Sequence, residues 1–328
     1  MSLKIGFVYD LKSDYKNFNL SSEQLAEFDS EDTIYAIEST LQDLGYSVER
    51  IGNIFNLVNQ LAQGKKWDLV FNIAEGLHGL AREAQVPALL DAYQIPYTFS
   101  NTETLILCHN KALAKKQIRD SGLTTAHYHL ISHLSDLSTL SLHFPLFAKP
   151  VAEGTGKGVS QKSLVYTKEE LEEIVSVLLT EFKQPVLVEE YLPGREFTVG
   201  VVGGDKGPQV LGVLEVILKQ GAEVGGHTYF NKENCETLVE YKLATDSIAS
   251  EVSKLVLESW QALGIRDCAR FDIRCNAQGI PSFIEVNPLA GLNPDRSDLL
   301  LLCKQINLPY KELIKRIVDS ALNRYKIS

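Results

Sequence analysis

The chain has 328 residues, of which 45% are hydrophobic and 23% are charged, and its formal net charge is −10. This length can bury more than one core, so we expect two or three compact units. The acidic balance argues against nucleic-acid and membrane partners, which select for excess Lys and Arg, and no apolar run approaches the roughly 20 residues that span a bilayer. Five scattered cysteines without a C-x-x-C pair argue against structural zinc and disulfides, and favour a cytoplasmic location.

The first hundred residues predict a parallel α/β sheet, because strand patterns alternate with helix patterns. We expect strands at residues 4–10, 46–52 and 67–73, with helices over residues 30–45 and up to about residue 64. No G-x-G-x-x-G follows the first strand, so a dinucleotide-binding fold is not supported.

Ligands of such sheets bind at the carboxyl ends of the strands. Residues 10–15 and 72–83 are therefore expected at a substrate cleft.

From about residue 108 the pattern changes. A lysine-rich helix is expected first, then a strand that runs into a glycine-rich loop, a helix with Thr167 as N-cap and Glu170 in a capping box, and another strand. Antiparallel strands, a helix, a hairpin and a closing helix follow. In chain order, the lysine-rich helix is expected at residues 110–123, the strand with the glycine-rich loop at 144–161, the capped helix at 167–179 and the next strand at 184–192. The later helix is expected at residues 247–264, the hairpin at 269–287 and the closing helix at 307–325.

The hairpin carries the most chemistry. Side chains alternate across a strand, so Arg270 and Asp272 share one face, as do Glu285 and Asn287 on the partner strand. Pairing brings carboxylate and amide oxygens together, and such hard ligands suit Mg²⁺ that carries nucleotide phosphates. The alternative is an ordinary salt bridge on a solvent-facing strand pair.

Two further stretches are compatible with a nucleotide. The run EGTGKGVS, after Lys149, is not a Walker A loop, but its glycines can offer backbone N–H groups to phosphate. The alternative is a plain flexible loop, although Lys149 at the end of an apolar strand must find an anion or reach water. In the connector VEEYLPGREF, Glu196 can accept ribose hydroxyls, and the alternative is a charged turn.

Taken in order, these segments resemble the D-alanine–D-alanine ligase family of the ATP-grasp superfamily across nearly the whole chain. The resemblance implies an α/β chain with an ATP-grasp fold behind an N-terminal parallel α/β domain. It divides the chain into a substrate domain (residues 1–107), a central ATP-grasp subdomain with the glycine-rich loop (residues 108–187) and a C-terminal subdomain with the Mg²⁺ site (residues 188–328).

The resemblance also assigns roles to residues. ATP would be bound by Lys111, Lys149, the loop residues Glu153, Gly154, Thr155 and Gly156, the connector residues Glu189, Glu190 and Leu192, and Glu196. The metal, Mg²⁺ or alternatively Mn²⁺, would be held by Asp272, Glu285 and Asn287. Arg270 and the Gly291 backbone would stabilise an oxyanion, and the mobile segment TYFNKE would supply Lys232.

The sequence departs from the family mostly on the substrate side. The N-terminal glutamate that holds the first amino acid's ammonium group has only candidates here, Glu27 and Asp29, with Glu31 near them. His78 and Ser297 are further candidates for substrate contact, and most histidines are expected at the surface. Arg82 stands where the family tends to be acidic and favours a carboxylate substrate, unless it pairs with Glu83 or Asp29.

The implied activity is an ATP-dependent ligase that activates a carboxylate as an acyl phosphate, joins it to an amine and releases ADP and phosphate. The expected partners are small amino-acid-like substrates, and a homodimer is left open. One alternative is an ATP-grasp ligase of a specialised pathway with a non-alanine substrate. Another is a non-catalytic nucleotide-binding regulator, which would have little need of an oxyanion donor such as Arg270.

Overall fold

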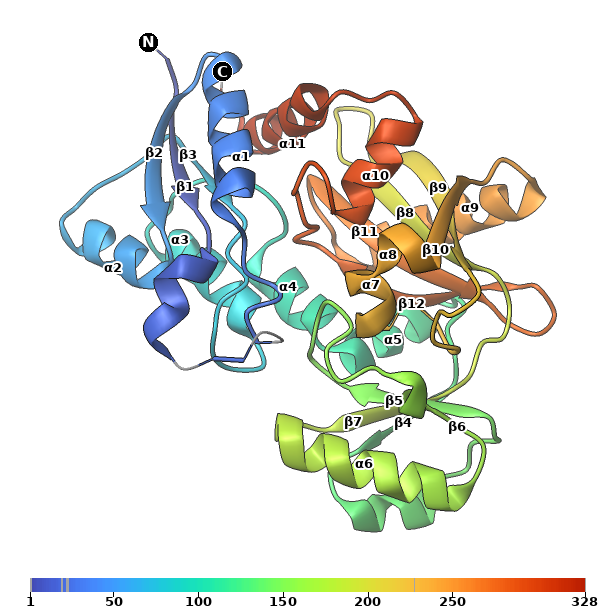
Figure 1. Cartoon of the computed structure of the whole chain (residues 1–328). Helices are drawn as coiled ribbons and strands as arrows, with labels where there is room; N and C mark the ends of the chain where they lie inside the picture. The colour runs from blue at the N-terminus through green and yellow to red at the C-terminus, as the bar shows by residue number, and fades with distance from the viewer. Residues whose placement is uncertain (1, 19, 22–23, 227, 328) are drawn as a thin grey trace.

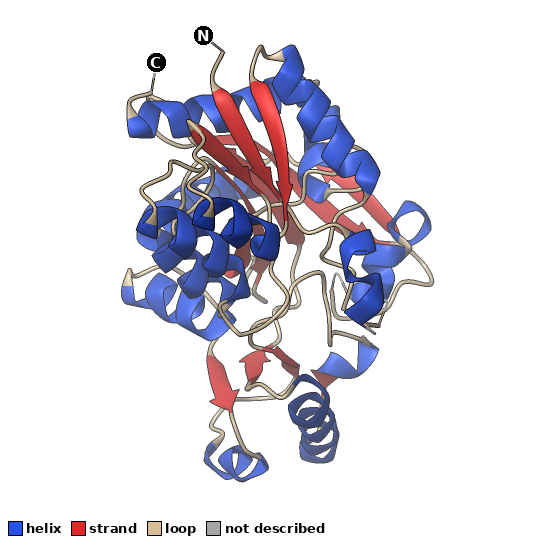
Figure 2. Ribbon diagram, turned by 90° about the vertical axis from the view of Figure 1, so that its left-hand side faces the viewer, coloured by secondary structure: helices blue, strands red, loops and turns tan. Residues whose placement is uncertain are grey.

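The structure is a computed structural model that describes residues 2–18, 20–21, 24–226 and 228–327. Three β-sheets form within these residues. In both views the four-stranded sheet and its helix α6 lie at the lower end of the molecule, below the other two sheets (Figures 1 and 2). None of the described helices combines the length and apolar character needed to cross a membrane.

The N-terminal sheet is parallel, in the order β2-β1-β3. Alternate side chains of its strands pack against α1 and α11 on one face and against α2 and α3 on the other. The three strands and two helices predicted here are confirmed. The elements are β1 (Lys4–Val8), β2 (Ser47–Gly52), β3 (Leu69–Asn72), α1 (Glu31–Asp43), α2 (Ile54–Ala62), α3 (Gln85–Ala92) and α11 (Tyr310–Tyr325).

Two short helices connect this sheet to the rest of the chain: α4 (Thr102–His109) and α5 (Lys111–Asp120). They meet at Asn110, whose side chain accepts hydrogen bonds from the backbone N–H groups of Ala112 and Leu113 and so caps α5. The break puts His109 at the end of one helix and Lys111 at the start of the next.

The four-stranded sheet has the order β4-β7-β5-β6, and α6 covers one face. Strand alternation sends Val186 and Val188 of β7 toward α6, and Leu187 and Glu189 toward the opposite face. The predicted capping box of α6 is confirmed, with Thr167 as the N-cap. The elements are β4 (Tyr128–Ile131), β5 (Leu146–Pro150), β6 (Leu164–Val165), β7 (Val186–Glu190) and α6 (Lys168–Phe182).

The five-stranded sheet is antiparallel, in the order β10-β9-β8-β11-β12. Helix α9 packs on one face, and α10 approaches the other so closely that a Cβ at Gly200 would meet Leu299 and Leu302. The elements are β8 (Glu196–Val202), β9 (Gln209–Leu218), β10 (Val239–Leu243), β11 (Cys268–Cys275), β12 (Pro281–Asn287), α7 (Tyr229–Glu233), α8 (Cys235–Leu238), α9 (Ser247–Leu263) and α10 (Asp298–Gln305). Short 3₁₀ helices are η1 (Lys12–Phe18), η2 (Arg82–Ala84), η3 (Leu134–Thr139) and η4 (Gln161–Ser163).

The predicted hairpin is β11 and β12. Its register pairs Arg270 with Asn287 and Asp272 with Glu285, so the four polar residues do lie opposite one another. A shift of register after Asp272 makes Ile284 an extra residue in β12. This bulge lets both Phe283 and Val286 reach the core under α9 while Glu285 stays on the opposite face.

Candidate active site

A cavity, here the central cavity, lies between the four-stranded and five-stranded sheets and is lined by residues of both. Many of the residues predicted to bind the nucleotide or the metal line this cavity, as does Lys232. They are Lys111, Lys149, Glu153, Gly156, Glu189, Glu190, Leu192, Glu196, Lys232, Asp272 and Glu285. Segments separated by more than a hundred residues thus meet at one place. The segment that supplies Lys232 is the short helix α7.

One wall of the central cavity is a buried chain of charges. Glu189 lies 2.7 Å from Lys149 Nζ and 2.9 Å from Lys115 Nζ. Burial would raise the pKa of Glu189, but the two lysines outweigh it and hold that pKa at about 2. Lys149 therefore finds the anion that its position at the end of an apolar strand requires.

The acidic end of the cavity is formed by Asp272 and Glu285. Burial raises the pKa of Asp272 to about 6, against the opposing charge of Arg270. Burial acts on Glu285 in the same direction, but Lys111 and Lys149 hold its pKa below the usual range. Lys111 Nζ lies 3.4 Å from Glu285 and also donates to the carbonyl of Glu153.

The connector between β7 and β8 closes the other end. Arg274 lies 3.3 Å from Glu196 and donates to the hydroxyl of Tyr191 at 2.8 Å. These contacts hold Glu196 at the cavity rim, while Leu192 is buried beside it. The arrangement offers an apolar wall and an anchored carboxylate together.

A second, smaller cavity adjoins the first and shares Lys111, Glu153 and Glu285 with it. We call it the adjoining cavity. Its lining comes from the N-terminal sheet's loops, the end of α4, the glycine-rich loop and the end of β12. The residues are Glu27, Glu75, Glu83, Cys108, His109, Lys111, Glu153, Gly154, Thr155, Glu285, Val286, Asn287, Pro288 and Leu289.

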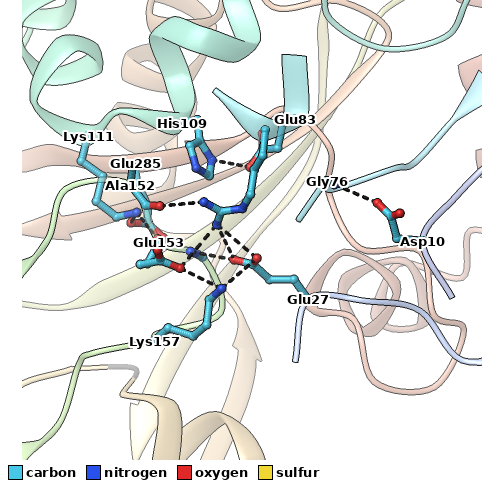
Figure 3. Close-up of polar contacts among 12 residues, drawn as sticks. Asp10, Glu27, Gly76, Glu83, His109, Lys111, Ala152, Glu153, Lys157 and Glu285 are labelled. Atoms are coloured by element: carbon cyan, nitrogen blue, oxygen red, sulfur yellow. Dashed lines mark hydrogen bonds and ion pairs between the residues drawn. The ribbon is translucent and has the colours of Figure 1, made fainter. Parts of the chain in front are cut away.

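Glu27 joins the N-terminal unit to the glycine-rich loop (Figure 3). It accepts the backbone N–H of Gly154 at 2.9 Å and pairs with Lys157 at 2.9 Å and Arg82 at 3.1 Å. Lys157 also lies 2.7 Å from Glu153. Burial opposes ionisation of Glu27, but Arg82 and Lys157 hold its pKa at about 2. The loop is thus fastened by a network of buried charges.

Three of the predicted residues line neither cavity: Arg270 on β11, and Gly291 and Ser297 after β12. Arg270 is held by Asp272 at 3.0 Å and by Asp298. Its Nε atom is buried and has no hydrogen-bond partner within the described residues. A Cβ at Gly291 would meet the hydroxyl of Ser297. Gly291 and Ser297 are therefore neighbours, and the Ser297 hydroxyl accepts the N–H of Asn293 at 3.0 Å.

The remaining substrate candidates are placed differently from one another. His78 is exposed and lines neither cavity. Arg82 pairs with Glu27 and Glu153 rather than with Glu83 or Asp29, because the glycine-rich loop brings Glu153 within 3.4 Å of it. Its guanidinium is thus already neutralised by carboxylates of the chain.

Asp29 lines neither cavity, and its burial raises its pKa to about 7. The folded state therefore binds a proton that the unfolded chain releases near its ordinary pKa, so stability falls as pH rises from about 4 to about 7. We expect Asp29→Asn to raise the melting temperature at pH 8 and to leave it nearly unchanged below pH 4. Thermal unfolding at both pH values measures this. Equal shifts at both would contradict the assigned cause.

Sequence reasoning missed several residues of the site. Lys157 stands in the glycine-rich run and could have been singled out there, and Lys115 is one helical turn after Lys111 and on the same face. Glu75 falls within residues 72–83, which were expected at the cleft, but it was not singled out, and His109 and Asp298 carry no local signal. Glu75 and His109 line the adjoining cavity, while Asp298 anchors Arg270.

Comparison with known proteins gives one consistent result. The family model for the D-ala D-ala ligase C-terminus matches residues 118–319. The D-alanine–D-alanine ligase of Aquifex aeolicus is 30% identical over 285 residues, covering 86% of this chain and 92% of that protein. An uncharacterized protein of Sinorhizobium fredii is 32% identical over 270 residues, covering 78% and 75%.

A solved structure shares the fold. The D-alanine–D-alanine ligase of Bacillus anthracis complexed with ATP superimposes with a TM-score of 0.73 at 22% identity, covering 99% of each chain. The central cavity lies among the segments that the sequence predicts for ATP. The chain therefore belongs to the D-alanine–D-alanine ligase family, has the ATP-grasp fold and is an ATP-dependent ligase of that type.

Proposed function

We propose that the protein activates a substrate carboxylate with Mg-ATP and joins it to the amine of a second amino-acid-like substrate, in the manner of D-alanine–D-alanine ligases. The observation that carries the proposal is that Asp272 and Glu285, which are opposite each other on β11 and β12, line the central cavity together with Lys111, Lys149 and Lys232. Transfer of a phosphoryl group needs both a metal site and cations for the developing charge.

The lysines and the connector supply the nucleotide end of this proposal. Lys111, Lys149 and Lys232 line the central cavity and can neutralise phosphate oxygens. Gly156, at φ 74°, turns the loop backbone so closely past Tyr229 that a side chain would collide with it. The connector would hold the base and Glu196 the ribose.

The residues at the acidic edge fit Mg²⁺. Within the described residues, no group of three His, Cys, Asp or Glu side chains is arranged to hold a metal ion. The chain offers two carboxylates, Asp272 and Glu285, which pair directly across the two strands, and the amide oxygen of Asn287 two residues after Glu285 on the same strand. A metal that brings nucleotide phosphate oxygens as further ligands needs no more than this. Bound there, Mg²⁺ would offset negative charge on the transferring phosphoryl group.

The chemistry proposed for the substrates has two steps. A carboxylate oxygen attacks the γ-phosphorus and ADP leaves, which gives an acyl phosphate. An amine nitrogen then attacks the acyl carbon, loses a proton, and expels phosphate. Arg270 is held in place by Asp272 and Asp298, and its unpartnered Nε–H is a donor for the oxyanion of this second step. Gly291 would offer a backbone N–H.

The test is ADP release with Mg-ATP across a panel of amino acids of both configurations and of hydroxy acids. We expect release that depends on both a carboxylate substrate and Mg²⁺, together with thermal stabilisation by Mg-ATP alone. Stabilisation without ADP release from any substrate would favour a non-catalytic regulator. Best turnover with a pair other than D-alanine and D-alanine would favour a specialised pathway. Absence of both responses in folded protein would sink the proposal.

A further inference from the structure

A third cavity, here the outer cavity, is lined by α6, β6, η4, the last residues of the glycine-rich loop and the segment that carries α7. Its volume of 860 Å³ falls within the range of about 300–1,000 Å³ that is typical of ligand sites. Of the residues that the structure describes, it shares only Val159 with the central cavity and none with the adjoining cavity. The function proposed above makes no use of it.

The outer cavity has an apolar lining that is open to solvent. Tyr166, Val177, Val224 and Phe230 all line it, and each is between 40% and 60% exposed. They come from three separate segments of the chain, so the fold brings them together. Large apolar side chains that gather at one exposed place mark a site for a ligand or a partner.

The charged groups of the outer cavity are mostly acidic. Its described lining holds four glutamates and one lysine, a formal charge of −3: Glu170, Glu173, Glu181, Glu223 and Lys162. The spacing of Glu170, Glu173 and Glu181 places all three on one side of α6. Glu170 closes the capping box of that helix, and Glu173 lies 3.3 Å from Lys162. The rim therefore keeps an excess of negative charge.

The aromatic rings of the lining point to the same kind of ligand as the carboxylates. Four rings line the outer cavity: Tyr166, Phe182, Tyr229 and Phe230. The face of an aromatic ring attracts a cation, and a carboxylate forms a charge-assisted hydrogen bond with an ammonium group. The rim would repel an anion, while a neutral ligand would leave the carboxylates without a partner. An apolar molecule that carries a positive charge complements both features.

The outer cavity is in contact with the central cavity through two segments of the chain. Val159 lines both cavities, and its carbonyl accepts the backbone N–H of Tyr229 at 3.4 Å. A Cβ at Gly156 would come within 2.9 Å of the Tyr229 backbone. The glycine-rich loop therefore packs directly against the start of α7, the helix that carries Lys232. A ligand in the outer cavity contacts both segments.

We propose that the outer cavity binds an apolar organic cation and that this binding strengthens the binding of Mg-ATP in the central cavity. The ligand bridges α6, the glycine-rich loop and α7, so it favours the arrangement in which these segments lie together. The same arrangement puts Gly156 and Lys232 at the proposed nucleotide site. The two ligands thus favour one state of the protein, and each raises the affinity for the other by the same factor.

The probe is 4-phenylbutylamine, and its neutral and anionic counterparts with the same apolar body are 4-phenylbutan-1-ol and 5-phenylpentanoate. Calorimetry on the full chain measures the three affinities without need of turnover. We expect the amine to bind at least about fivefold more tightly than the alcohol, because one exposed ion pair contributes up to about that factor. The acid is expected to show no binding. Butylamine, which lacks the ring, should bind more weakly than 4-phenylbutylamine.

Variants of α6 locate the bound amine. Glu173→Gln combined with Glu181→Gln is expected to bring the affinity for the amine down to that of the alcohol, and to leave the alcohol unaffected. Glu169→Gln combined with Glu172→Gln is the matched control, since both are exposed glutamates of α6 that line none of the three cavities. Val177→Trp should weaken amine and alcohol alike, because the indole ring occupies part of the cavity.

The coupling is measured as the affinity for Mg-ATP with and without saturating 4-phenylbutylamine. We expect the bound amine to tighten Mg-ATP binding about fivefold, at the lower end of typical couplings between sites. The Glu173 and Glu181 double variant should bind Mg-ATP like the wild type and lose most of this enhancement at the same amine concentration.

The proposal is overturned if the alcohol binds folded protein as tightly as the amine, if neither binds, or if the double variant keeps the preference. It is also overturned if bound amine leaves the affinity for Mg-ATP unchanged. Absence of Mg-ATP binding itself would overturn the function proposed above, and a preference for the amine that the double variant removes would still support the cation site.

Discussion

Replacing Glu285 or Asp272 with alanine is expected to lower kcat by at least about 10³-fold, because a metal that stabilises transferring charge contributes several kcal/mol to the barrier. The two carboxylates are directly opposite each other in the register of β11 and β12 and line the central cavity. Each removal takes a charged oxygen ligand from the proposed metal site, and neither deletes a core side chain. Steady-state ADP release at saturating Mg-ATP measures the effect.

The fold of both variants is expected to survive. Asp272 pairs with Arg270 and Glu285 pairs with Lys111, so each substitution removes one ion pair but leaves the apolar core intact. Glu240→Ala, at an exposed position of the same sheet, is the control and should keep full activity. Near-normal turnover by Glu285→Ala, with a normal melting temperature, would refute the metal assignment.

Lys115→Met is expected to lower the free energy of unfolding by about 3 kcal/mol, the scale of breaking a buried ion pair. Lys115 is fully buried, lies 2.9 Å from Glu189, and donates to the hydroxyl of Thr125 and the carbonyl of Phe283. Methionine fills the same volume but satisfies none of these acceptors. Glu189 would keep only Lys149 as its partner.

The neighbouring residue provides the matched control. Lys116 has a side chain that is 60% exposed and pairs with Asp120 on the surface, so Lys116→Met should change stability by no more than about 0.5 kcal/mol. Urea unfolding of the three proteins measures both values. Equal stability of Lys115→Met and wild type would show that the buried pair only offsets its own desolvation.

The hairpin shows what local pattern can and cannot predict. Alternation along β11 places Phe271 and Ile273 in the core and Arg270 and Asp272 on the other face, as the sequence indicates. The bulge at Ile284 lets Phe283 and Val286 both pack in the core under α9, and no pattern of residues along the strand predicts it. The face of the sheet on which Glu285 lies was predicted correctly, but the bulge at Ile284 was not predicted.

Residues far apart in the sequence explain most of what was missed. Glu27 and Gly154 are 127 positions apart, and Lys115 and Phe283 are 168 apart. No periodic pattern or fixed spacing within a single sequence predicts contacts between residues that are so far apart in the chain. Glu27 was singled out as a substrate candidate and Glu75 was not, and only the fold shows that Glu27 is paired within the chain while Glu75 lines the adjoining cavity.

The contacts of Glu27 with the glycine-rich loop have a kinetic consequence. Any movement of residues 154–157 away from the N-terminal unit requires Gly154 and Lys157 to be released from Glu27. Opening of that kind occurs on the microsecond-to-millisecond scale and sets the turnover number of many enzymes. The N-terminal unit, which supplies Glu27, thereby restrains a loop whose residues Glu153, Gly156 and Lys157 line the central cavity, although it contributes no side chain to that cavity itself.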